Sequence, residues 1–372
     1  MTNATEQDLI NIKEIEDFLN TEGVEYTKRE DRFDLMINNV DGTQGVWTLY
    51  HPVWSYTGEN GQVTEVRYIN SASHRIDCSK KWGKDYYGIP QNFFSKLSKE
   101  KEDEGIRTIF IKDYEIAEGQ DVEEPDGTIT KNYRRKWEVI KSTMLTAAAK
   151  IKIRIFARDC EVRIVPSQKK RKGDFNQLRW FLEKNCLYGY RPAAVNLGLY
   201  LKKDKAGFKK GDLLMVETYG SGFYSNKNHK EDPIVEVIRA STKTYVQVVG
   251  GASKLLKHFL KNYPTIEFNK KTYPVNKVLF YVDVCHSFAK SMSALGYKFD
   301  GWDTRGGGFH NFAVEEINED GLYVPKGRMY QRMPMKHKLI MKLMKEHKSI
   351  SIPHAGTKVY SIDREEWLKE NK

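Results

Sequence analysis

The sequence has few cysteines and no long apolar run, and these absences exclude several classes of protein. The four cysteines among 372 residues are too few and too far apart for a disulfide scaffold. No Cys-x-x-Cys pair and no paired histidine spacing is present, so the pattern argues against a structural zinc site. No segment is apolar for long enough to span a bilayer, and the first residues lack the basic and apolar regions of a signal peptide. We therefore expect a cytoplasmic protein with reduced thiols.

The charge of the chain is divided unevenly. Residues 1–150 hold 20 Lys and Arg against 27 Asp and Glu, a net charge of −7, whereas residues 151–372 hold 41 against 23, a net charge of +18. A basic excess of this size is typical of proteins that bind the phosphate backbone of nucleic acids. Charge for solubility alone is the simpler alternative, and a membrane surface fits less well because the basic residues do not follow one helical face. The expected partner is nucleic acid, DNA before RNA.

Length and composition predict two soluble domains. Hydrophobic residues make up 40% of the chain and charged residues 30%, and 372 residues exceed what one core usually holds. We expect an α+β protein with domains at 1–150 and 151–372, because a helix predicted over 134–149 leads into the basic half. The tract 118–130, rich in Gly, Asp, Glu and Pro, is expected to be a flexible excursion.

Hydrophobic periodicity locates the other elements. In the first part it predicts helices over 7–20 and 93–104 and strands over 32–37, 46–50, 63–69 and 106–111. In the second part it predicts a helix over 175–184 and strands over 151–156, 160–165, 196–201, 212–218, 234–239 and 277–283.

A glycine-rich turn at 247–252, Gln-Val-Val-Gly-Gly-Ala, opens a helix predicted over 253–260. Unpaired backbone N–H groups and the positive end of the helix dipole at such a turn suit a pyrophosphate. The simpler alternative is a strand-to-helix turn in which Gly250 and Gly251 supply a positive φ.

The order of this block resembles the acyl-CoA-binding core of the GNAT acyltransferases, whose signature is Gln/Arg-x-x-Gly-x-Gly/Ala before a helix. Gln247, Gly250 and Ala252 match the signature, and Leu295-Gly296-Tyr297 falls where those domains have their Leu-Gly-Phe helix end. The resemblance implies an acyl-CoA cofactor, held by Gln247, Val249, Gly250, Gly251, Ala252 and Ser253.

Over most of its length the chain resembles phage homing-endonuclease-like proteins, which join a Vsr-type nuclease domain of the PD-(D/E)xK class to a GNAT-like module. Matching blocks include residues 104–115, 155–161, 249–255 and 330–339. The resemblance implies a restriction-endonuclease-like domain followed by a GNAT-like domain with a mixed sheet.

Nucleases of this class hold Mg²⁺ with carboxylates on adjacent strands. Asp34 lies where the family has its first metal-binding aspartate, but the segment 45–50 lacks the carboxylate that the family has next. Glu65-Val66-Arg67 imitates Glu-x-Lys with arginine in place of lysine, so Glu65 is the candidate second ligand. The first domain is therefore interpreted as a degenerate nuclease, kept for partner binding or as a scaffold.

Candidate catalytic residues of the second domain follow from the same resemblance. Cys186 stands where the family has a histidine, and it could act as a nucleophile if its pKa is lowered, a packed thiol being the alternative. Glu236 and Arg239 are expected either to contact the substrate or to form a salt bridge that fixes the strand. Asp283 and Ser287 match a block of the family, and an ordinary helix cap is the alternative. His286 has no counterpart in the family. The candidate set is Glu236, Arg239, Asp283, Ser287 and Cys186.

Cations interleaved with aromatic residues predict phosphate contacts and a stacked base. The predicted nucleic-acid-binding residues are Lys169, Lys170, Arg171, Lys172, Arg305, Arg328, Tyr330, Arg332, Lys336 and Lys338.

These features predict a phage-type acyltransferase that uses acyl-CoA to modify a nucleobase or a substrate bound to nucleic acid. Two other functions stay open. One is a homing-endonuclease-like DNA nuclease that uses Mg²⁺ at Asp34 and Glu65, and the other is a non-catalytic DNA-binding regulatory protein. The sequence leaves the acyl group, the target base and the oligomeric state open.

Overall fold

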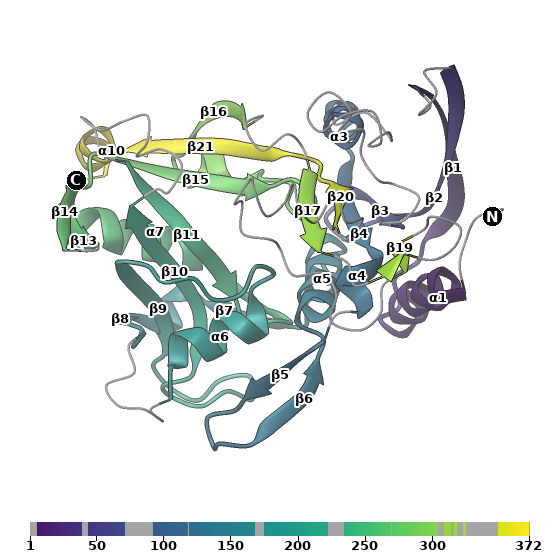
Figure 1. Cartoon of the computed structure of the whole chain (residues 1–372). Helices are drawn as coiled ribbons and strands as arrows, with labels where there is room; N and C mark the ends of the chain where they lie inside the picture. Colours follow the sequence, from purple (N-terminus) through teal and green to yellow (C-terminus); the bar gives the residue numbers. More distant parts are fainter. Residues whose placement is uncertain are drawn as a thin grey trace.

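The protein has a mixed α+β fold built on two main sheets (Figure 1). The computed structural model describes residues 6–38, 44–70, 92–117, 119–167, 175–221, 234–268, 270–303, 309–313, 316–317, 323–324 and 349–371. Within these residues, no helix is long and apolar enough to cross a membrane.

The first sheet has four strands in the order β1-β2-β3-β4. Its strands are β1 (Thr27–Asn38), β2 (Gln44–Thr57), β3 (Val63–Ile69) and β4 (Arg107–Lys112). The first three are antiparallel neighbours, and β4 runs parallel to β3 after a crossover through α3 (Phe93–Asp103). Helices α1 (Glu6–Thr21), α4 (Asp113–Ala117) and α5 (Arg135–Ala147) complete this part.

Apolar side chains at helical spacing hold the helices on this sheet. Ile12, Ile15 and Leu19 of α1 are buried in one cluster with Trp54 of β2 and Trp137 of α5. The predicted helices and strands of the first part are confirmed. Helix α3 ends at Asp103, one residue before the predicted end, and Gly105 then takes a positive φ of 77°.

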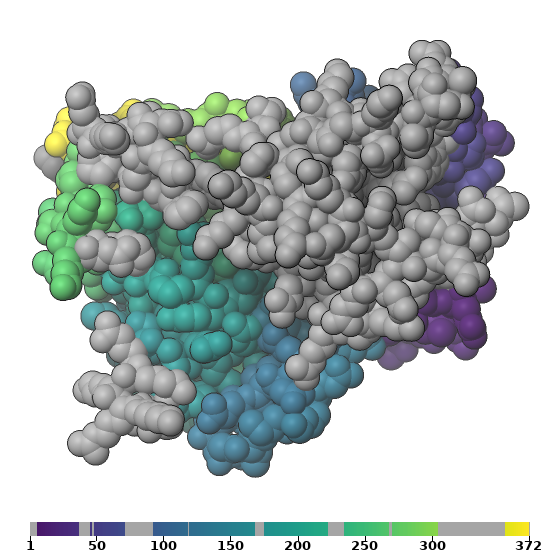
Figure 2. Space-filling view, in the orientation of Figure 1, coloured from purple at the N-terminus to yellow at the C-terminus, as the bar shows by residue number. Residues whose placement is uncertain are grey.

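The tract 118–130 contains a β-hairpin, so the prediction of a flexible excursion there was wrong. Strands β5 (Gln120–Glu123) and β6 (Ile129–Tyr133) pair antiparallel. Contacts far along the chain support them, because Glu124 accepts hydrogen bonds from Trp180 and Lys184. The hairpin lies beside α6 (Gln177–Asn185) at the lower edge of the molecule (Figures 1 and 2).

The second sheet has seven strands in the order β16-β21-β15-β11-β10-β9-β8. Its members are β8 (Cys160–Ile164), β9 (Val195–Leu201), β10 (Leu213–Ser221), β11 (Val235–Thr242), β15 (Lys277–Asp283), β16 (Lys298–Asp303) and β21 (Thr357–Asp363). The neighbours are antiparallel except for β11 and β15, which run parallel and pair only at Val235 with Val278 and Glu236 with Leu279. The two strands part beyond these residues, so the sheet opens at their carboxyl ends.

Helices cover both faces of this sheet. Leu255, Phe259 and Leu260 of α7 (Gly251–Asn262) are buried on one face. Leu178 and Phe181 of α6 join a separate cluster on the other. The remaining elements are β7 (Ile153–Phe156), η1 (Ala157–Asp159), β12 (Val246–Val249), β13 (Thr265–Phe268), β14 (Lys271–Pro274), α8 (Ser291–Ala294), β17 (Phe309–Ala313), β18 (Glu316–Ile317), β19 (Tyr323–Val324), β20 (Ser349–Pro353) and α10 (Arg364–Glu370).

The two main sheets meet at the carboxyl end of β15. The backbone N–H of Phe110 in β4 donates to the carbonyl of Cys285 at 2.8 Å. Phe110, Val284, Cys285 and Ala355 share one buried apolar cluster with residues of the first sheet. The parts before and after residue 150 therefore pack against each other through a common core.

Candidate functional site

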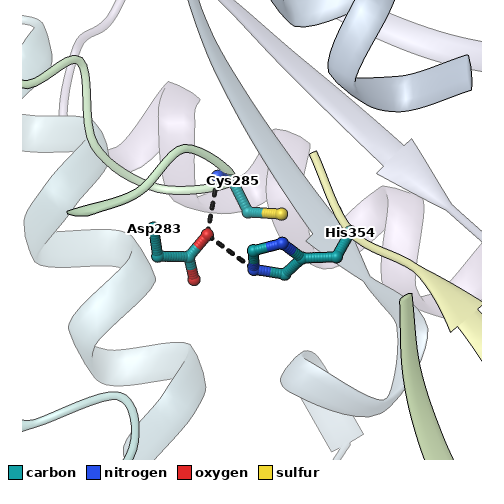
Figure 3. A group of neighbouring side chains, drawn as sticks. All are labelled: Asp283, Cys285 and His354. Carbon is teal, nitrogen blue, oxygen red and sulfur yellow. Dashed lines mark hydrogen bonds and ion pairs between the residues drawn. The ribbon is translucent and has the colours of Figure 1, made fainter. Parts of the chain in front are cut away.

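A group of polar and ionisable side chains lies where β15 ends and β21 begins. Asp283 is the last residue of β15, Cys285 follows two positions later, and His354 precedes β21. Asp283 is opposite Thr357 in the antiparallel pair, and the N–H of Val284 donates to the carbonyl of Gly356 at 3.1 Å. Strand pairing thus brings together residues that are far apart in the sequence (Figure 3).

Asp283 is the centre of this group. Its Oδ1 lies 2.9 Å from Nε2 of His354 and accepts the backbone N–H of Cys285 at 2.8 Å (Figure 3). The sulfur of Cys285 accepts the backbone N–H of Ala355 at 3.2 Å. Cys285 and His354 are buried. A carboxylate, a thiol and an imidazole therefore meet in one small volume.

The second oxygen of Asp283 contacts Tyr188 and His286. Its Oδ2 accepts the hydroxyl proton of Tyr188 and lies 3.3 Å from Nδ1 of His286. The Tyr188 residue is 39% exposed, although its hydroxyl lies against Asp283. Arg239 of β11 donates to the carbonyls of Tyr188 and Gly189. The loop after α6 therefore spans the gap between β11 and β15 and connects the group to the surface.

The first sheet contributes a buried ion pair to the same region. Nζ of Lys112, at the end of β4, lies 3.5 Å from Oε1 of Glu115 in α4. Oε2 of Glu115 accepts the backbone N–H of Lys112 at 2.9 Å and lies 3.4 Å from Nε2 of His286. Lys112, Glu115, His286 and Asp283 form a chain of alternating charge between the two parts.

These neighbours shift the pKa values of the group. Burial opposes each charged form, but His354 and Lys112 lower the pKa of Cys285 below its ordinary value. Cys285 and Asp283 raise the pKa of His354 to about 10, against its desolvation, and Glu115 and Asp283 raise that of His286 to about 9. The pKa of Asp283 lies well below its usual range because both histidines outweigh its burial. Shifts of this kind are typical of functional sites and of structural ion networks alike.

The predicted catalytic residues do not all lie in the group around Asp283. Asp283 lies in the group, Ser287 follows it on the same turn, and Arg239 reaches it through Tyr188. Glu236 is buried in β11 at the junction with β15. Cys186 directly follows α6, and burial raises the pKa of its thiol, which is the opposite of what a nucleophile needs.

The predicted cofactor-binding turn forms as expected in its backbone. Gln247 and Val249 lie in β12, and Gly250 takes a φ of 75° directly before α7. A Cβ at Gly251 would lie 2.7 Å from the sulfur of Met215, so this glycine is needed for packing. A Cβ at Gly250 would lie in open space, with the Cβ of Ala157 as a neighbour at 3.8 Å. Ala252 is half-buried and Ser253 exposed.

Asp34 and Glu65 do not form one metal site. Asp34 is opposite Thr48 on β2, whereas Glu65 is opposite Ser55. Positions 48 and 55 are roughly 24 Å apart along an extended strand, and their odd spacing puts the two carboxylates on opposite faces of the sheet. The joint Mg²⁺ site of the nuclease alternative was therefore wrong.

Each of these carboxylates has local partners of its own. Asp34 accepts hydrogen bonds from Thr48 and Arg32. Glu65 pairs with the buried Arg67 at 2.5 Å and with Arg29 at 2.8 Å.

The predicted nucleic-acid contacts lie outside the described residues. This holds for the basic run 169–172, for Arg305, and for the C-terminal set Arg328, Tyr330, Arg332, Lys336 and Lys338.

Sequence reasoning missed Cys285, His354, Glu115 and Lys112 as members of the group. Asp-x-Cys-His at 283–286 was a visible signal, since it puts three ligand types within four positions. Nothing in the sequence linked His354 to it, because the pairing of β15 with β21 provides that link.

The chain was also compared with known proteins. No protein-family model matches it, and no curated protein is significantly similar to it.

Proposed function

We propose that the protein is a cytoplasmic, acyl-CoA-dependent acyltransferase of the phage type, acting on an amine of a nucleobase or of a substrate bound to nucleic acid. The observation that carries the proposal is the junction between β11 and β15. These parallel neighbours pair at two positions and then part. Such an opening suits an extended thioester arm that hydrogen-bonds to the freed backbone edges.

The glycine turn supports this proposal. Gly251 packs against Met215, which is opposite Thr242 at the carboxyl end of β11. The N-terminus of α7 therefore lies at the edge of the sheet where β11 and β15 part. Backbone N–H groups and the helix dipole at that place suit the pyrophosphate of a coenzyme A. This arrangement supports a GNAT-like assignment for the second part of the chain.

Acyl transfer at this edge needs few protein groups. The amine nitrogen attacks the thioester carbonyl and gives up one proton to solvent, the carbon–sulfur bond breaks, and the coenzyme leaves as a thiolate that takes up a proton. Tyr188 stands at the opening with its hydroxyl held by Asp283. Burial and Asp283 keep the pKa of Tyr188 well above its ordinary value, so the hydroxyl keeps its proton on the hydrogen bond to Asp283, and the proton for the thiolate comes from solvent.

The first part of the chain supports a degenerate nuclease domain. Its order of one helix, three antiparallel strands, a crossover helix and a parallel fourth strand is compatible with the αβββαβ core of PD-(D/E)xK nucleases. Because Asp34 and Glu65 point to opposite faces of the sheet, we propose a scaffold or partner-binding role for this part.

Coenzyme binding tests the proposal. We expect the full-length protein to bind acetyl-CoA in calorimetry, and Gly250→Val to weaken binding by about 10- to 100-fold, roughly 1–3 kcal/mol of lost charge-assisted hydrogen bonds. Gly127→Val is the matched control. Gly127 also has a positive φ, 83°, and open space around it, but it lies in the β5–β6 turn. Equal weakening by both variants, or no binding by the parent protein, would contradict the proposal.

Nucleic-acid binding tests the expected partner. We expect the full-length protein to bind labelled DNA, with an affinity that falls steeply as salt rises, because phosphate contacts release counterions. Replacing Lys169, Lys170, Arg171 and Lys172 by serine is expected to make the plot of log binding constant against log salt concentration less steep, by up to about one unit of slope per lost phosphate contact. Lys131→Ser, at a cation with a 74% exposed side chain in the acidic half, serves as the control. Fluorescence anisotropy at several salt concentrations gives the slopes, and an unchanged slope in the quadruple variant would exclude this segment.

A non-catalytic DNA-binding protein is the second candidate function, supported by the net charge of +11. This second function is favoured if the protein binds DNA but does not bind acetyl-CoA.

A further inference from the structure

We propose that Asp283, Cys285 and His354 form a zinc-binding site, which the acyltransferase proposal does not include. One donor atom from each residue lies within 4.8 Å of the donor atoms of the other two. The group thus combines a thiol, an imidazole and a carboxylate in one small volume.

The backbone holds the three residues in place. Asp283 and Cys285 lie at the end of β15, and His354 lies just before β21. The backbone bond from Val284 to Gly356 joins the two segments between these residues. The N–H of Phe110 in β4 donates to the carbonyl of Cys285, which fixes this turn against the first sheet. Ligands attached to paired strands are positioned more rigidly than ligands on a free loop.

The donor set favours zinc over harder cations. Thiolate and imidazole are the preferred ligands of Zn²⁺, and a carboxylate oxygen commonly completes its shell, whereas Mg²⁺ and Ca²⁺ prefer oxygen ligands alone. Three protein ligands leave one position of a tetrahedral ion for a water or a substrate atom.

Groups around the ligands orient them as in established metal sites. The N–H of Ala355 donates to the sulfur of Cys285 at 3.2 Å, and the hydroxyl of Tyr188 and the ring of His286 face Oδ2 of Asp283. Partners of this kind hold ligand orientation and are as much a part of a metal site as the ligands.

Nε2 is the nitrogen of His354 that would bind the ion. Nε2 is within hydrogen-bonding distance of Asp283, and Nδ1 accepts the N–H of Gly356 at 3.0 Å. An ion on Nε2 takes the place of the contact between this nitrogen and Asp283, so both residues become ligands of the same ion.

Cobalt substitution tests the site. Full-length protein stripped of metal with a chelator is titrated with Co²⁺, and we expect a thiolate-to-cobalt charge-transfer band that saturates at one ion per chain and disappears when Zn²⁺ is added, because zinc binds such sites more tightly. Cys285→Ser is expected to abolish the band and to weaken zinc binding more than tenfold. Cys160→Ser, at another buried cysteine, is the matched control and should leave both unchanged.

X-ray absorption on the zinc-loaded parent protein decides the question without any variant. We expect one sulfur near 2.3 Å and nitrogen or oxygen ligands near 2.0–2.1 Å around the ion, to within about 0.2 Å. A shell without sulfur, a cobalt band that persists in Cys285→Ser, or no stoichiometric metal binding would overturn the proposal.

Discussion

Replacing Glu115 by alanine is expected to lower the free energy of unfolding by about 3–5 kcal/mol, because it leaves a buried charge without its partner. Lys112 is only 2% exposed, and Glu115 is the carboxylate in its ion pair. The bond from Glu115 to the backbone N–H of Lys112 and its contact with His286 are lost in the same variant. Urea denaturation of the variant and of the parent protein measures the difference.

Two controls separate charge from packing in this experiment. The double variant Lys112→Met with Glu115→Leu removes both charges, and we expect it to recover most of the lost stability. Glu366→Ala breaks the exposed pair with Lys298 and should cost less than about 1 kcal/mol. If Glu115→Ala costs no more than Glu366→Ala, the buried pair does not stabilise the junction between the sheets.

The protein is expected to lose about 3 kcal/mol of stability as the pH rises from about 4.5 to 7, owing to Glu217 in β10. Burial raises the pKa of this carboxyl to about 7, although a hydrogen bond from Tyr219 at 2.8 Å lowers it in part. The unfolded chain ionises Glu217 near its ordinary pKa of 4.5, whereas the folded chain keeps it protonated up to about 7. The contribution is therefore complete below pH 4.5, falls between the two values, and is constant above pH 7.

Glu217→Gln isolates this effect because glutamine keeps the shape and a hydrogen-bonding oxygen but does not ionise. At pH 8 we expect the variant to be more stable than the parent protein by up to about 3 kcal/mol, and at pH 4 to be nearly equal to it. Denaturation midpoints across this range supply the comparison. A difference between variant and parent that does not change with pH would show that Glu217 ionises normally in the folded protein.

The sequence predicted the elements best where side chains repeat at a regular spacing. The strands expected over 196–201 and 277–283 are β9 and β15, and the stripe of apolar residues over 7–20 is α1. The β5–β6 hairpin was missed because its residues are polar and its support comes from α6, through Glu124 with Trp180 and Lys184. The local sequence of the hairpin does not indicate contacts with residues so far along the chain.

The candidate site was predicted only in part, for the same physical reason. Asp283 was named because it matches a block of the family that the chain resembles, but the rest of the group comes from β4, α4, the loop after α6 and the segment before β21. Cys186 was named as a candidate because it stands where the resemblance has a histidine, with a packed thiol as the alternative. Only the fold shows that His354 and Lys112 outweigh burial at Cys285 and lower the pKa of its thiol, whereas burial outweighs Arg239 and Arg135 at Cys186 and raises it.

The position of β21 has a consequence for how the protein is made. It lies between β15 and β16 in the sheet, yet it follows both in the chain. On the ribosome, Cys285 leaves the exit tunnel roughly 3–14 s before His354, at translation rates of about 5–20 residues per second. During this interval the edge of β15 that will receive β21 is unpaired, and such an edge attracts chaperones or neighbouring nascent chains. The nascent chain therefore passes through a stage in which most of the second sheet has been made but the place of β21, between β15 and β16, is empty. We expect chaperones to bind the chain most at that stage.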